Sequence, residues 1–322
     1  MYLQRFLGLA ALAIVAVAAH GAALAQAGST RIVIAFPPGG PVDFVGRVLA
    51  EGLARELGHT VLVDNKPGAN GGVAAQFVAR ATPDGSTLWL TSVGAIAINP
   101  SLYEALTYDV QRDFAPVSLV VNNNELLVVN PANPATNAIE FVAAARAKKE
   151  PTAMASSGIG SVPHLAMELL AEASKTSLLH VPYKGAAPAI TDVMAGQVAA
   201  FFGDIPGLIG HIKGGKLKAI GIAAPTRHPL LPEVRTLDEQ GLRGVDSNNW
   251  YGLMAPAGTP PARIEALNAA VRRVLGTEQV RARLAASGAE PAASSPAELG
   301  AMIKADTAKW AKIIRDKKIK GE

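Results

Sequence analysis

Few side chains of this sequence are placed to do covalent chemistry. Ser157 and Ser161 stand close to His164, and a serine beside a histidine could act as nucleophile and general base in an exported hydrolase. Neither serine lies in the G-x-S-x-G elbow of hydrolases, and no nearby residue is placed to orient the histidine. The sequence has no histidine pair at metal-ligand spacing and no G-x-x-x-x-G-K-[ST] phosphate loop. We therefore expect no catalytic residue, no metal site, no cofactor and no enzymatic activity.

The segment FPPGGPVD (36–43) offers a different chemistry, because it joins an apolar strand to a helix through prolines and glycines. Gly39 and Gly40 let the backbone approach a bound group, and free amides at the start of a helix favour an anion. Asp43 is placed to cap the helix expected over 43–57 by accepting hydrogen bonds from the amides of its first turn. A plain strand–helix connection is the alternative, since Pro and Gly also favour ordinary turns.

Three further loops have the same character: 67–75 (PGANGGVAA), 155–165 (ASSGIGSVPHL) and 180–190 (HVPYKGAAPAI). In the second of them, Ser161 is predicted at the N-cap of a helix and Pro163 in its first turn. Loops of this kind collect at the carboxyl ends of the strands in open parallel sheets, and ligands bind there.

Several side chains in or near these loops have two interpretations each. His164 could contact a ligand or make a local capping contact, and Lys184 could meet an anion or be an exposed turn residue. His180 fits a strand or core position better than a binding position. Asp204, in FFGDIPG, could accept a ligand amine or cap the next helix.

Apolar runs typical of strands alternate with helical patterns along the chain, which predicts an α/β fold with mostly parallel sheets. Two features predict a division into lobes: the asparagine-interrupted run VVNNNELLVV (120–129) and the Pro- and Gly-rich passage 225–244. We expect a discontinuous first lobe of residues 28–123 and 245–322, a continuous second lobe of residues 124–244, and a hinge of two crossover segments.

The N-terminus predicts export. Arg5, a short apolar run over 6–18 and Ala23-Leu24-Ala25 form the pattern of a signal peptide over residues 1–25. A membrane anchor is the alternative, but the run is short for spanning a bilayer. The chain has no cysteine, and an exported protein without disulfides fits a bacterial periplasm. With a formal net charge of +4 and no basic block with interleaved aromatics, nucleic-acid binding is not expected.

The order of several motifs resembles one family. These motifs are FPPGGPVD, NKPGANGG, TPDGSTLWL, INPSLY, DFAPVSLV, HVPYKGAAPAITDVMAGQV, GKLKAI and YGLMAPAGTPP. From about Thr30 to its end, the sequence resembles the Bug family, the extracytoplasmic solute receptors of tripartite tricarboxylate transporters. The resemblance implies a two-lobed periplasmic binding protein of type II (Venus flytrap) that captures a small carboxylate and delivers it to transporter membrane subunits. We expect a monomer.

The resemblance also implies ligand contacts from both lobes. The first lobe contributes Phe36, Pro37, Gly39, Asp43 and Ser92. The second lobe contributes Ser156, Ser157, Gly160, Ser161, His164, Tyr183, Lys184, Gly185, Ala186, Ala187 and Asp204.

Two departures from the family pattern leave the ligand open. Many members have Thr-His where this chain has Ala95-Ile96, and the acidic position near the cleft varies, here with Gly203 before Asp204. A citrate-like acid, a smaller or less polar acid, and a neutral ring with an amide all stay possible. A receptor that presents its ligand to a two-component sensor is an alternative function.

Overall fold

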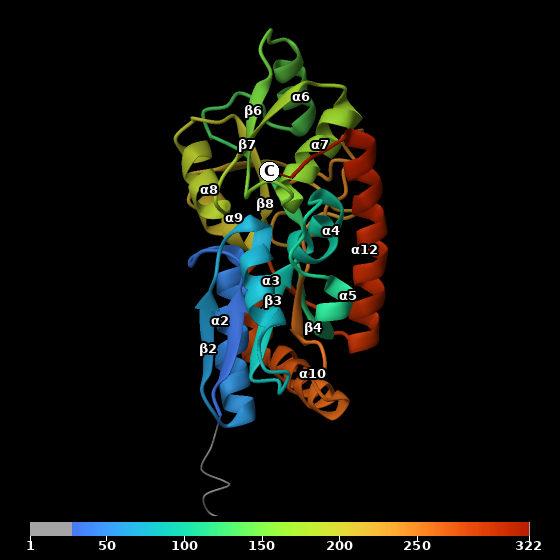
Figure 1. Ribbon diagram of the computed structural model, residues 1–322. Coiled ribbons are helices and arrows are strands. Elements are labelled where there is room, and N and C mark those ends of the chain that lie inside the picture. Colours follow the sequence, from blue (N-terminus) through green and yellow to red (C-terminus); the bar gives the residue numbers. More distant parts are fainter. Residues whose placement is uncertain (1–27, 322) are drawn as a thin grey trace, which may run out of the picture.

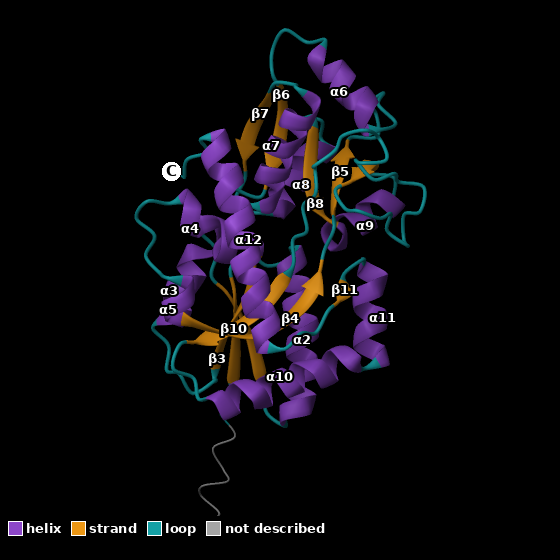
Figure 2. Cartoon of the chain, turned by 90° about the vertical axis from the view of Figure 1, so that its right-hand side faces the viewer, coloured by secondary structure: helices purple, strands orange, loops and turns teal. Residues whose placement is uncertain are grey.

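The computed structural model describes residues 28–321, and the predicted signal peptide over 1–25 lies outside them. Figure 1 shows two bodies stacked end to end, with helix α12 running along both. In the view of Figure 2, strands lie between helices in each body. The predicted two-lobed α/β fold is confirmed. We call the body around the six-stranded sheet lobe 1 and the body around the five-stranded sheet lobe 2.

Lobe 1 is built on a sheet with strand order β11-β4-β10-β3-β1-β2. Its strands are β1 (Thr30–Ile34), β2 (Val61–Asn65), β3 (Thr87–Ser92), β4 (Phe114–Asn122), β10 (Tyr251–Pro256) and β11 (Glu290–Pro291). Its helices and helical turns are α2 (Pro41–Leu57), η1 (Ala69–Gly71), α3 (Gly72–Ala79), η2 (Gly94–Ile98), α4 (Asn99–Leu102), α5 (Val110–Asp113), α10 (Pro261–Gly276), α11 (Glu278–Ser287) and α12 (Pro296–Lys317).

Lobe 2 is built on a sheet with strand order β7-β6-β8-β5-β9. Its strands are β5 (Glu125–Val129), β6 (Thr152–Ser156), β7 (Leu178–Pro182), β8 (Ala200–Asp204) and β9 (Lys218–Ile222). Its helices are α6 (Ala138–Arg146), α7 (Val162–Ser174), α8 (Ala186–Met194) and α9 (Ile205–Lys213).

Strand direction differs in part from the prediction of mostly parallel sheets, because both sheets are mixed. Parallel pairing holds for β1 with β2 and β3, and for β6 with β7 and β8. Strands β5 and β10 instead pair antiparallel with their neighbours. Each of these two strands follows a crossover from the other lobe, so it starts at the cleft and runs away from it. The parallel strands run toward the cleft and end there.

Each sheet separates two apolar clusters. Along β1, Ile32 and Ile34 pack into one cluster while Val33 packs into the other, as the two-residue period of a strand requires. The cluster that contains Val33 also includes Val162 and Leu165 of α7, so it extends from lobe 1 into lobe 2. The lobes are therefore packed against each other on this side of the cleft.

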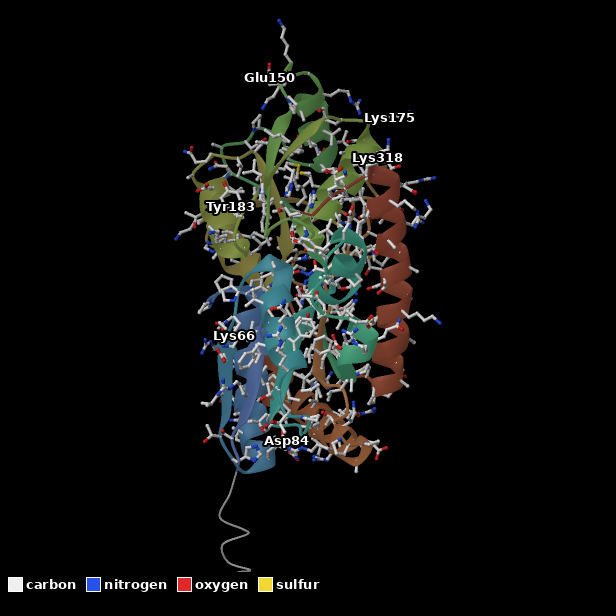
Figure 3. All side chains as sticks on the ribbon, in the orientation of Figure 1. Lys66, Asp84, Glu150, Lys175, Tyr183 and Lys318 are labelled. Atoms are coloured by element: carbon white, nitrogen blue, oxygen red, sulfur yellow. The ribbon has the colours of Figure 1, made fainter. Side chains whose placement is uncertain are left out.

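Helix α12 contacts both lobes on this same side of the cleft. Lys317 Nζ, at its end, lies 2.9 Å from Glu172 Oε2 of α7. Figure 3 shows the neighbouring Lys318 and Lys175 at this end of the molecule. Among residues 28–321, no helix has both the length and the apolar character needed to cross a membrane.

Candidate ligand-binding site

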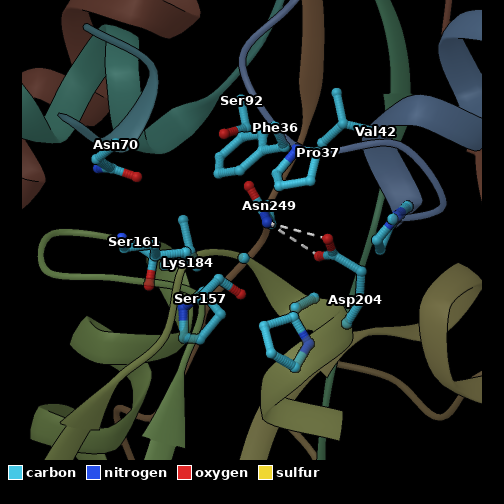
Figure 4. Close-up of a pocket in the computed structure, with 18 of the residues that line it drawn as sticks. Phe36, Pro37, Val42, Asn70, Ser92, Ser157, Ser161, Lys184, Asp204 and Asn249 are labelled. Atoms are coloured by element: carbon cyan, nitrogen blue, oxygen red, sulfur yellow. Dashed lines mark hydrogen bonds between the residues drawn. The ribbon is translucent and has the colours of Figure 1, made fainter. Parts of the chain in front are cut away.

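A pocket lies between the lobes where the cleft-facing loops meet (Figure 4). It contains about 560 Å³ of empty space, part of it open to solvent. Its lining residues are Phe36, Pro37, Pro38, Gly40, Pro41, Val42, Asn70, Ser92, Ser157, Ser161, Val162, Pro163, Lys184, Gly185, Ala186, Ala187, Pro188, Asp204 and Asn249.

Most of the predicted site residues lie in this lining, and they come from both lobes. Those in the lining are Phe36, Pro37, Ser92, Ser157, Ser161, Lys184, Gly185, Ala186, Ala187 and Asp204. Those outside it are Gly39, Asp43, Ser156, Gly160, His164 and Tyr183. The second group supports the loops whose other residues face the pocket, as their hydrogen bonds show.

The loop between β1 and α2 is held in place by Asp43 and Asn65. Asp43 Oδ2 accepts from the Gly39 amide at 3.0 Å, and Asn65 Nδ2 donates both to Asp43 Oδ1 and to the Phe36 carbonyl at 2.9 Å. Arg47 Nε donates to Asp43 Oδ2 at 2.8 Å. Burial raises the pKa of Asp43, but the hydrogen bonds from Arg47, Gly39 and Asn65 outweigh it and leave that pKa below its ordinary value.

The predicted role of Asp43 as the cap of this helix is wrong. The N-cap residue is Gly40, without a side-chain cap, and the helix begins at Pro41. Proline suits the first helical position because its fixed φ is already helical and its missing N–H is not needed there. Asp43 therefore falls inside the first turn, and its carboxylate reaches back to the amide of Gly39, before the helix.

The loop between β6 and α7 confirms the predicted cap. Ser161 is the N-cap, and its hydroxyl accepts from the His164 amide and donates to the Gly158 carbonyl at 2.7 Å. Gly158 and Gly160 have φ angles of 133° and 74°, a region that favours glycine.

His164 makes the local contact that was one of its two interpretations. Its Nδ1 accepts from the Gly160 amide at 3.1 Å. Its ring stacks on His180 with a centroid separation of 3.7 Å, and His180 Nε2 lies 2.6 Å from the Ser156 hydroxyl. Burial lowers the pKa of His164 to about 3 and that of His180 to about 4. Both rings are neutral at physiological pH and support the loop from behind.

The loop between β7 and α8 is bonded to the previous one. The amides of Tyr183 and Gly185 donate to the carbonyls of Ser156 and Ser157, both at 3.1 Å. The Tyr183 hydroxyl donates to Asp192 in α8. Gly185 is the N-cap of α8 and provides no side-chain cap, so the first amides of this helix are available beside Ala186 and Ala187. Lys184 lines the pocket (Figure 4).

Asp204 occupies the N-cap position of α9 but makes no capping hydrogen bond. Its carboxylate accepts instead from Asn249 Nδ2, at 3.0 and 3.2 Å, and from the Tyr251 hydroxyl (Figure 4). Burial raises its pKa, and these two donors partly offset that rise. Of its two interpretations, the cap is therefore wrong, and the contact with a ligand amine stays a prediction.

Sequence reasoning missed two polar residues of the lining, Asn70 and Asn249. Asn70 has φ 45° in the loop before α3, and its Nδ2 donates across the cleft to the Gly160 carbonyl at 2.8 Å. The Asn-Gly pair in PGANGG was a local signal for such a backbone. Asn249 lies in the second crossover, the segment 223–250 between β9 and β10, where no local pattern distinguishes it.

Two α/β lobes that close on a pocket lined by backbone donors and hydroxyls define the class of periplasmic binding proteins. A solved periplasmic binding protein, BugD, has the same fold, with a TM-score of 0.86 and 33% identity over 91% of this chain and 99% of that chain. The chain belongs to the tripartite tricarboxylate transporter receptor family, whose model matches residues 45–319.

Two structures similar to this chain contain organic acids. MatC from Rhodopseudomonas palustris, with bound malate, has a TM-score of 0.84 and 33% identity over 89% of this chain and 98% of that chain. The R. palustris protein Rpa4515, with adipate, has a TM-score of 0.87 and 30% identity over 89% of this chain and 96% of that chain.

Proposed function

We propose that this protein captures a small organic carboxylate between its two lobes in the periplasm and delivers it to the membrane subunits of a tripartite tricarboxylate-type transporter. The family and the malate- and adipate-bound neighbours support this function. We propose as its site the pocket lining together with the loop residues behind it. The lobe boundaries at 123/124 and 244/245 stay a prediction, supported by the change of sheet between β4 and β5 and between β9 and β10.

The observation that carries this proposal is the convergence of three helix starts on one pocket. Helices α2, α7 and α8 begin at the pocket, which is also lined by Ser92 and Ser157. Backbone amides at helix starts carry partial positive charge and suit a carboxylate. Each hydrogen bond contributes about 1 kcal/mol net, and about 3 kcal/mol when charge-assisted. A few of them, added to burial of the ligand, can reach the −8 kcal/mol or so of a micromolar complex.

The same contacts favour binding without chemistry. The Ser161 hydroxyl is used as a helix cap, and His164 Nδ1 is used by a backbone amide. A hydrolase would need this histidine free to take a proton from one of the serines. We propose that the receptor releases its ligand unchanged, acts as a monomer, and loses residues 1–25 on export.

A thermal-shift screen tests the proposal. Malate, adipate, succinate, citrate and nicotinamide are titrated into the purified mature chain, and each mixture is analysed by mass spectrometry afterwards. A ligand at 100 times its dissociation constant should stabilise the protein by about 2.7 kcal/mol and be recovered intact. Stabilisation by none of the acids, or recovery of a reaction product, would contradict the proposal.

A further inference from the structure

Four polar side chains meet at the hinge side of the pocket. Asp204 ends β8 and Glu125 begins β5, and the two are direct partners in the antiparallel register. Asn249 and Tyr251 come from the second crossover and the start of β10. The bridge between Asn124 and Asn248 holds the two crossover segments side by side. Asp204 and Asn249 reach the pocket, and Glu125 lies behind them with no exposed surface.

The hydrogen bonds of this cluster leave acceptors without donors. Asn249 is 7% exposed, and its Oδ1 is buried without a partner among residues 28–321. Figure 4 shows the Asn249 amino group facing Asp204 and this oxygen on the other side of the amide, toward Phe36. A carboxylate offers about four acceptor positions, and within residues 28–321 the donors to Asp204 are Asn249 and Tyr251. Two neighbouring lining residues therefore carry unused acceptor positions at one end of the pocket.

Glu125 limits the charge of the cluster. Both of its carboxyl oxygens are buried without a hydrogen-bond partner in the described part of the chain. An ionised carboxylate in such a place is costly, so the group takes up a proton instead. Burial raises the pKa of Glu125, the nearby charge of Asp204 raises it further, and the neighbouring Asn249 side chain offsets only part of this rise. The pair thus holds at most one negative charge, on Asp204, which has the donors.

We infer that Asp204 and Asn249 Oδ1 form a subsite for an N–H donor of the ligand, either an ammonium or an amide, with Glu125 as a neutral neighbour. This inference rests on the proposed function, because it assumes that the ligand's carboxylate is held by the helix starts. Among the lining residues Asp204 is the single acid and Lys184 the single base. A ligand with a carboxylate at one end and an N–H donor at the other is complementary to both ends of the pocket. A plain dicarboxylate places a second negative charge against Asp204.

Matched ligand pairs test the inference on the unmodified protein. In β-alanine an ammonium replaces one carboxylate of succinate, in 4-aminobutyrate it replaces one carboxylate of glutarate, and succinamate carries an amide in place of one carboxylate of succinate. We expect the nitrogen-bearing member of a pair to bind at least tenfold more tightly by calorimetry. Equal or tighter binding of the plain dicarboxylates would overturn the inference but leave the proposed function intact. Binding of no acid in either series would overturn both.

Two substitutions give a second test. Asp204→Asn removes the charge, so the preference for the nitrogen-bearing ligand should fall to less than threefold, with the loss confined to that ligand. Glu125→Gln replaces a neutral acid by a neutral amide of the same shape, so both affinities should stay within about threefold of the unmodified protein. An equal loss for both ligands in Asp204→Asn, or a changed preference in Glu125→Gln, would contradict the subsite. The matched-pair result stands by itself if Asp204→Asn does not fold.

Discussion

Closure of the two lobes can be tested at Gly207 in α9, which faces lobe 1 across the cleft. A Cβ added at Gly207 would lie 2.8 Å from Cγ of Pro41, the first residue of α2. At Gly210, about one turn further along the same helix, such a Cβ would meet nothing within 4 Å among residues 28–321 apart from its own helix backbone and chain neighbours. Gly207→Ala and Gly210→Ala therefore make the same chemical change in the same helix, and the first alone obstructs the contact between lobes.

The expected size of the effect follows from this distance. Carbon atoms pack at about 3.5–4.0 Å, so the alanine at 207 must push the lobes apart by roughly 0.7–1.2 Å. Overpacking of this kind costs about 1–3 kcal/mol, and the proline ring cannot rotate away. Since about 1.4 kcal/mol is a factor of ten, the dissociation constant should rise by roughly 5- to 150-fold. In an open form the two lobes are apart at this point, so the variant protein does not carry this cost. The substitution should also stabilise helix α9, because alanine favours a helix over glycine by up to about 1 kcal/mol.

Calorimetry with the acid that gives the largest thermal shift measures the affinity, and urea unfolding without ligand measures stability. Gly207→Ala should bind weakly and unfold no more readily than the unmodified protein, while Gly210→Ala should match it in affinity. Equal affinity of the two variants would refute the reasoning, because the lobes would then not need to approach this closely when ligand is bound.

Two further predictions concern the loops behind the pocket. Asp43→Asn should lower the free energy of unfolding by about 2–4 kcal/mol and weaken ligand binding, because it replaces a buried carboxylate that accepts charge-assisted hydrogen bonds. The exposed Glu51→Gln on the same helix, which loses only surface ion pairs, should change the free energy of unfolding far less in urea unfolding. Second, the lowered pKa values of His164 and His180 mean that the unfolded chain binds more protons than the folded chain below about pH 6.5. Their contribution to stability is complete above that pH and is lost as pH falls toward 4, by up to about 1.4 kcal/mol per pH unit for each ring. His180→Gln should therefore flatten the fall of unfolding free energy between pH 6.5 and 5 relative to the unmodified protein; an unchanged slope would show that the ring is not kept neutral. Buried acids such as Asp204 change the pH dependence of stability in the opposite direction. They are present in both proteins, so their contribution cancels when the two slopes are compared.

The features that local sequence could predict were those with a local cause. Ser161 was recognisable as a cap because a serine before a proline-containing first turn is an N-terminal signal. Asp43 was misplaced because Pro41 was a better helix start two residues earlier. The loop residues that line the pocket follow strands that end at the cleft, so their approximate place followed from the order of elements.

The remaining features depend on contacts between distant segments. The direction of β5 and β10 is decided by the lobe from which the chain arrives, which no local pattern records. His164 is held by His180 from a neighbouring strand. The cluster of Asp204 with Glu125 and Asn249 joins residues 45 to 124 positions apart and exists only because both crossovers meet at the hinge.

Backbone amide NMR of the isotope-labelled mature chain tests most directly whether main-chain donors of opposing lobes hold the acid. On addition of the tightest-binding acid, the amides of Gly40, Ser157, Ala186 and Ala187 should shift together, and the spectrum of the excess acid should stay unchanged for hours. Shifts confined to one lobe or to a surface away from the cleft, or new signals from a converted acid, would contradict the account.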